Sequence, residues 1–139
     1  MDLLINIDVD DLDKATAFYE KALGLRVGRR FEFGVELVGA SSPIYLLVKR
    51  EGTTASSTTD DTRRYRRHWT PVHLDFVVED IEHAVQRAIK AGATQESDVL
   101  IHDYGRVVYM ADPFGHGICL VQFEGRGYDG VALSNAREH

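Results

Sequence analysis

The sequence predicts one α+β domain built from two tandem β-α-β-β-β modules. Each half of the chain begins with a short run rich in β-branched residues, followed by two acidic residues and an amphipathic segment that glycine ends. Three strand-like runs come next in both halves. Val9 and Val78 take the same place in the two halves, and so do Gly24 and Gly92, so the order of elements is repeated.

The first module covers about residues 3–49. Residues 3–9 (LLINIDV) are predicted to form a strand with Ile5, Ile7 and Val9 on one face. Apolar residues at helical spacing predict a helix over 12–23, which Gly24 ends. Strand-like runs follow at about 25–33, 35–39 and 43–49.

Residues 50–69 separate the two modules and include the polar stretch EGTTASSTTDDTRR. A loop of this length is either a linker or a functional lid. Its basic run, formed by Arg63, Arg64, Arg66 and Arg67, is a solvated face, a contact for an anionic ligand or a contact between subunits.

The second module covers about residues 71–123. Its first strand, 71–78, is predicted to face the helix with Val72, Leu74, Phe76 and Val78. The remaining elements are a helix over 81–91 and strands at about 94–102, 105–111 and 117–123. A polar tail, 124–139, is expected to be loose.

The composition places the chain, taken as one domain over 1–139, among ordinary globular proteins, with 44% hydrophobic and 27% charged residues. A net charge of −6 argues against nucleic-acid binding, which needs a basic footprint. The single cysteine, Cys119, excludes an internal disulfide and suits a reducing compartment. The N-terminus shows neither a signal-peptide pattern nor a long apolar run, so we expect a cytoplasmic protein that does not bind membranes.

The first strands of both modules carry polar residues on the face opposite their helices. Leu4, Asn6 and Asp8 share this face in module one, and His73, Asp75 and Val77 share it in module two. Buried polar groups are costly unless they are paired. A ligand cavity and mutual hydrogen bonding between the modules are the two explanations.

Three segments resemble the vicinal oxygen chelate superfamily, which includes glyoxalase I, extradiol dioxygenases and bleomycin-binding proteins. They are INIDVDDLDKATAFYEKALGL, VHLDFVVEDIEHAVQRAIKAGA and DYGRVVYMADPFGHGICLVQF. The most specific match is the turn Asp112-Pro113-Phe114-Gly115 before the last strand. The resemblance implies a curved, cavity-enclosing mixed sheet with its helices on the convex side, and a homodimer whose cavities are often shared between subunits.

In metal-dependent members of that superfamily, four positions on the first and last strands of the modules supply the ligands. The resemblance places them at Leu4, Tyr45, His73 and Cys119, and only His73 matches a usual ligand. We therefore expect no cofactor. If a divalent metal binds, His73 and Cys119 would be its ligands, and the spacing selects none of His68, Asp75, His102 or His116 to complete the set.

His73 is the one candidate for a catalytic acid or base. It either contacts a ligand, pairs with Asp75 or Asn6, or is structural. Cys119 is either an inert core residue or a thiolate activated by His73. The candidate ligand-binding residues are Asn6, Asp8, Tyr45, Trp69, His73, Asp75, Tyr104, Arg106, Tyr109 and Cys119.

Three functions fit these features. The first is a metal-free protein that binds a small, partly apolar or cationic aromatic molecule, because the chain is acidic and the usual metal-ligand set is incomplete. The second is a superfamily enzyme, a lyase, isomerase or dioxygenase, that uses His73. The third is an interaction protein that makes its contact through loop 50–69.

Overall fold

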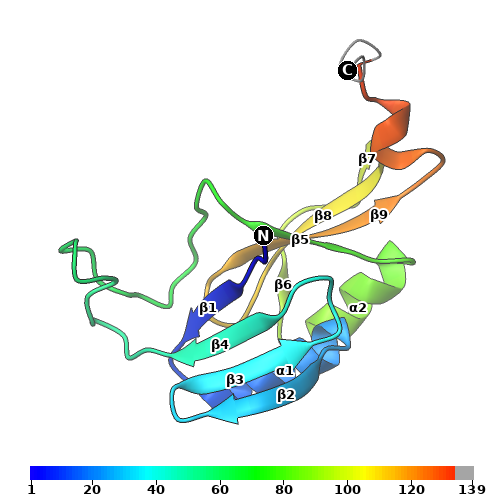
Figure 1. Ribbon diagram of the computed structural model, residues 1–139. Coiled ribbons are helices and arrows are strands. Elements are labelled where there is room, and N and C mark those ends of the chain that lie inside the picture. Colours follow the sequence, from blue (N-terminus) through cyan, green and yellow to red (C-terminus); the bar gives the residue numbers. More distant parts are fainter. Residues whose placement is uncertain (134–139) are drawn as a thin grey trace.

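A computed structural model describes residues 1–133, and the last residues of the expected polar tail lie outside this range. The chain forms two β-α-β-β-β modules (Figure 1), and the predicted α+β fold is confirmed. Each module contains one mixed sheet and one helix. The two sheets are not hydrogen-bonded to each other within the described residues, so the chain carries two open sheets and not one continuous sheet.

Module one begins with strand β1 (Ile5–Val9) and helix α1 (Leu12–Leu23), which has the predicted bounds. The Asp11 carboxylate caps this helix by accepting a hydrogen bond from the Lys14 amide, and Gly24 ends it at a φ of 69°. Strands β2 (Arg26–Phe31), β3 (Gly34–Val38) and β4 (Ile44–Val48) follow. The sheet order is β1-β4-β3-β2, with β1 and β4 parallel.

Module two repeats this order with β5 (Leu74–Val77), α2 (Ile81–Ala91), β8 (Gly105–Ala111) and β9 (Gly117–Phe123). Its sheet order is β5-β9-β8-β6, and β7 also pairs with β8. Helix α2 and the last two strands have the predicted bounds. The Asp80 carboxylate caps α2 as Asp11 caps α1.

Two strand predictions in module two are corrected. The run 94–102 is two strands, β6 (Thr94–Gln95) and β7 (Leu100–His102), because the Tyr109 amide donates to Ser97 Oγ in place of a backbone carbonyl. Strand β5 starts at Leu74, so Val72 precedes it and is 82% exposed instead of facing the helix.

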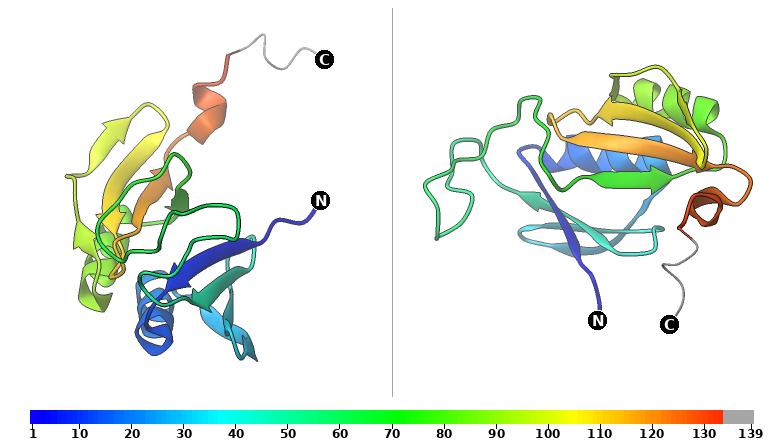
Figure 2. Two further views of the ribbon diagram at one scale, coloured as in Figure 1. Left: turned by 90° about the vertical axis from the view of Figure 1, so that its left-hand side faces the viewer. Right: turned by 90° about the horizontal axis from the view of Figure 1, so that it is seen from above.

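One hydrophobic core joins the modules. The helices lie side by side, each packs on the sheet of its own module, and Figure 2 shows the two sheets splayed apart from each other. The buried Tyr19 hydroxyl of α1 donates to Asp112 Oδ2 at 2.6 Å, across the module boundary. We call the sheet face turned away from its helix the outer face.

The segment between β4 and β5 is held against its own chain. Arg63 Nε lies 2.7 Å from Asp8 Oδ2 of β1, and the Tyr65 hydroxyl donates to the Lys49 carbonyl. Arg67 forms an ion pair with Glu96. Two members of the basic run therefore pair with acidic side chains of the same chain.

The described part of the tail contains a short 3-10 helix at Gly127–Gly130. Tyr128 of this turn packs edge-on against Phe123 at a centroid distance of 4.7 Å. No helix among residues 1–133 has the length and apolar character needed to cross a membrane.

Candidate functional site

The duplication places equivalent residues in a row across the outer face of each sheet. In module one, Tyr45 of β4 lies between Asn6 of β1 and Glu36 of β3. In module two, Cys119 of β9 lies between its neighbours on β5 and β8, Asp75 and Tyr109. Tyr45 and Cys119 therefore occupy equivalent positions, as the duplication predicts.

In module one, the side chains of this row are tied together by an ion pair between Arg29 and Glu36. Arg29 Nη2 lies 2.7 Å from Glu36 Oε2, and the Tyr45 hydroxyl donates to the same oxygen at 3.1 Å. Hydrogen bonds from Arg29 lower the pKa of Glu36 to about 2. Sequence reasoning missed both residues, although a lone carboxylate in the apolar strand GVELV was a readable signal.

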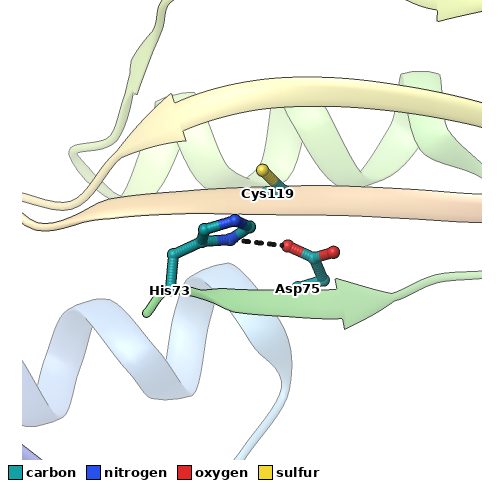
Figure 3. Close-up of side chains that lie close together, drawn as sticks. All are labelled: His73, Asp75 and Cys119. Atoms are coloured by element: carbon teal, nitrogen blue, oxygen red, sulfur yellow. Dashed lines mark ion pairs between the residues drawn. The ribbon is translucent and has the colours of Figure 1, made fainter. Parts of the chain in front are cut away.

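The row in module two carries a histidine–carboxylate pair. His73 precedes β5, and its Nδ1 lies 3.0 Å from Asp75 Oδ1, with both side chains 40% exposed. Figure 3 shows the imidazole and the carboxylate pointing toward one another beside Cys119. Pairing of His73 with Asp75, one of the alternatives from the sequence, is confirmed, and it leaves Nε2 of His73 free.

Cys119 is 2% exposed and lies beside this pair. Burial, together with the neighbouring Asp75 carboxylate, raises the pKa of its thiol to about 12. The thiol is therefore protonated at neutral pH. A thiolate nucleophile at this position has no support, and the inert core cysteine is the alternative that fits.

Aromatic side chains line a cavity above the row in module two. Trp69 is perpendicular to His73 at 5.7 Å and to Tyr109 at 5.8 Å between ring centroids. Together with Glu96 they line a cavity of about 370 Å³, which we call the aromatic pocket. Trp69 and Tyr109 are 44% and 41% exposed, so both rings are open to a ligand.

The long segment before β5 supplies Trp69, and Arg67, Glu96 and Gly117 hold it; sequence reasoning places Arg67 only in the basic run and does not single out the other two. The Arg67 guanidinium lies 4.4 Å from the centroid of the indole ring, and its ion pair with Glu96 fixes it there. Gly117 of β9 makes room for the ring, because a Cβ at that position would lie 2.5 Å from the indole.

The other predicted site residues are spread around the aromatic pocket. Tyr104 covers Val107, Cys119 and Val121 on the same outer face, and burial raises its pKa. Arg106 does not reach this face. It alternates with Val107 and forms ion pairs with Glu82 of α2 and Glu124.

Asn6 and Asp8 lie at a second hollow, a cleft of about 540 Å³ between the β1 and β5 edges. His73 lines both this cleft and the aromatic pocket, and so connects them. Tyr45 lines neither hollow, because Glu36 and Arg29 hold it on the outer face of module one.

Three donors at or beside the aromatic pocket come near enough to one another to hold a metal. A ring nitrogen of His73, an Asp75 oxygen and Cys119 Sγ lie within 4.8 Å of one another. The family positions themselves do not form a ligand set, since Leu4 offers no donor and Tyr45 is bonded to Glu36. His73, Asp75 and Cys119 form a hydrogen-bonded cluster, and a metal ion bound there would have to displace the thiol proton of Cys119.

The sequence profile of the glyoxalase-like domain family matches residues 4–121. A curated relative, the anthracycline biosynthesis protein DauV of Streptomyces sp. (strain C5), is 27% identical over 123 residues. That match covers 85% of this chain and 40% of the relative, so the chain spans about two fifths of its length.

Solved structures share the fold. A glyoxalase/bleomycin resistance protein/dioxygenase family enzyme from Burkholderia phytofirmans PsJN superposes with a TM-score of 0.70 at 19% identity, covering 89% of this chain and all of that one. The fosfomycin resistance protein FosX from Listeria monocytogenes gives 0.67 at 18% identity, covering 88% and 92%. The match of the family profile to residues 4–121, most of the chain, shows that this protein belongs to the glyoxalase-like domain family.

Proposed function

We propose that this protein binds a small, partly apolar or cationic aromatic molecule in the aromatic pocket, without a metal at that site. The observation that carries the proposal is the Trp69 ring, which stands perpendicular to both His73 and Tyr109, with His73 paired to the Asp75 carboxylate. Aromatic walls favour flat apolar ligands and attract cations through their ring faces. The net charge of −6 attracts cations over longer range.

The binding test uses protein treated with EDTA and a panel of cationic aromatic antibiotics. Trp69 is the one tryptophan in the sequence, so its fluorescence reports on the aromatic pocket. We expect quenching by at least one compound, and a binding constant at least tenfold weaker by calorimetry in Trp69→Ala and Tyr109→Ala. Phe33→Ala is the matched control, because Phe33 is an exposed aromatic residue of module one. Absence of binding across the panel overturns the proposal.

The second candidate function is catalysis by His73. The Asp75 carboxylate on Nδ1 orients the imidazole and leaves Nε2 to take or give a proton, the arrangement of a general acid or base. The reaction classes are those of the superfamily: lyase, isomerase or dioxygenase. His73→Ala should abolish a detected turnover and Asp75→Asn should reduce it. Unchanged turnover in His73→Ala removes this residue from the chemistry.

We also propose a cytoplasmic homodimer in which cavities are shared between subunits. Strands β1 and β5 each pair on one side within the described residues, so each has an open edge. Exposed apolar side chains lie on or beside these edges, among them Leu4, Val72 and Val77. Light scattering on the purified protein tests this proposal: a dimer mass is expected, and a monomer at tens of micromolar contradicts it.

A further inference from the structure

Two histidines that the aromatic pocket does not use are held side by side by their backbones. His68 lies in the segment before β5, and His116 immediately precedes β9. The two residues form an isolated parallel bridge, and the His68 amide donates to the Gly115 carbonyl at 2.9 Å. Their positions therefore depend on main-chain contacts between segments 48 residues apart in sequence.

Backbone carbonyls determine which nitrogen of each ring carries hydrogen. His68 Nδ1 lies 2.7 Å from the Arg66 carbonyl oxygen, and His116 Nε2 lies 2.8 Å from the Asp8 carbonyl oxygen. A carbonyl can only accept a hydrogen bond, so both of these nitrogens are protonated. In the neutral rings, His68 Nε2 and His116 Nδ1 are then both unprotonated.

These two unprotonated nitrogens face each other at 3.2 Å. Two lone pairs at this separation repel unless an electron-poor centre lies between them. The rings are nearly perpendicular, at 86° in an edge-on arrangement, so they are not stacked face to face. A single proton or a metal ion can satisfy both nitrogens.

We infer that His68 and His116 form a binding site for a divalent transition-metal cation of the Zn²⁺, Ni²⁺ or Cu²⁺ class. Imidazole nitrogens suit these ions and bind zinc at about 2.0–2.1 Å. Two nitrogens 3.2 Å apart can both reach one ion at that distance, with an angle at the metal of about 100°, near the tetrahedral value. An N–H to carbonyl bond on the outer nitrogen is the usual support of a metal-binding histidine.

The site is open on one side. Both imidazoles line the cleft of about 540 Å³ between the β1 and β5 edges, so water or a small ligand can complete the coordination. No third histidine, cysteine or carboxylate among residues 1–133 groups with the pair as His73 groups with Asp75 and Cys119. The His68–His116 pair is thus a different set of donors from His73, Asp75 and Cys119, and two protein ligands imply moderate affinity.

The experiment titrates Zn²⁺, and separately Ni²⁺, into the full chain stripped with EDTA and returned to metal-free buffer at pH 7.5. We expect one equivalent to bind by calorimetry and the unfolding temperature to rise, because the unfolded chain does not hold the two ligands together. His68→Gln and His116→Gln should each weaken binding at least tenfold. His102→Gln is the matched control, since His102 is an exposed histidine on another strand.

Two measurements keep the assignment falsifiable if a variant folds poorly. Nitrogen-15 NMR of the wild-type rings should show Zn²⁺ shifting His68 Nε2 and His116 Nδ1 with their outer nitrogens still protonated. The double variant His73→Gln/Cys119→Ser should keep full affinity. If no metal binds, the two nitrogens share only a proton and the inference is overturned. The inference is also overturned if the His68 and His116 variants keep the affinity and the double variant His73→Gln/Cys119→Ser loses it. The ligand test of the proposed function runs in EDTA, so the two results are independent.

Discussion

Replacing Gly117 with alanine should displace the Trp69 ring, which forms one wall of the aromatic pocket. The added Cβ would lie 2.5 Å from the indole, so the ring has to move by about 1 Å or more to restore ordinary contact. The movement disturbs the contact with the Arg67 guanidinium and the perpendicular packing on His73 and Tyr109.

The size of the effect on binding follows from the contacts that a ligand loses. Aromatic packing on the indole contributes about 0.5–1.5 kcal/mol, and a cation on the ring adds about 0.5–1 kcal/mol. Gly117→Ala should therefore weaken a cationic aromatic ligand by about 1–2.5 kcal/mol, or ~5–70-fold.

The assay is the emission and the acrylamide quenching of Trp69, followed by ligand calorimetry. The emission should change before any ligand is added, because the ring leaves its place beneath Arg67. Gly130→Ala is the control, because a Cβ there meets Arg126 Cβ at 3.4 Å, an ordinary contact. Gly117→Ala with unchanged emission, quenching and affinity would refute the reasoning.

Three further predictions follow from the buried polar groups. The pKa of the Cys119 thiol is raised to about 12 from an ordinary value of about 8.5, so the thiol should not react with Ellman's reagent at pH 8 until urea unfolds the chain. Because this pKa is raised in the folded state, the stability that the buried thiol contributes is present below about pH 8.5 and is lost as the pH rises toward 12. Tyr19→Phe removes the hydrogen bond to Asp112, which is 4% exposed, and should lower the free energy of unfolding by about 1.5–3 kcal/mol in urea titrations. Glu36 should titrate by NMR near pH 2, so its ion pair with Arg29 stabilises the fold above about pH 4.3 and is lost as the pH falls toward 2.

Each of these predictions has a contradicting outcome. Rapid thiol modification of the folded protein would place Cys119 at the surface. Tyr128→Phe, at an exposed position, should leave stability unchanged, and an equal loss in both tyrosine variants would remove the special role of the Tyr19 bond. An ordinary titration of Glu36 near pH 4.3 would show that Arg29 does not hold it in solution.

The helices could be predicted to the residue because their signals are local. Asp11 and Asp80 cap them, Gly24 and Gly92 end them, and apolar residues recur at helical spacing between these points. The break between β6 and β7 could not be predicted, because it depends on a hydrogen bond from Tyr109 to Ser97, 12 residues earlier.

The candidate site was predicted in part. Alternation along the first strand of module two indicated that His73 and Asp75 share a face, and their pairing is observed. The position of Trp69 could not be predicted from the sequence, because it depends on the space above Gly117 and on the ion pair between Arg67 and Glu96. Arg106 alternates with Val107, but only the packed structure shows that it turns toward α2.

The aromatic pocket is built partly on the sheet of module two and partly on the segment between β4 and β5, and this affects how its ligand preference can change. Asp75, Tyr109 and Cys119 stand on paired strands of module two, so replacing them alters the sheet itself. Trp69 stands on a segment that contributes little to the common core. Substitutions there can remodel one wall of the aromatic pocket at small cost to folding, which makes the stretch between β4 and β5 the natural region for diversifying or engineering what the protein binds.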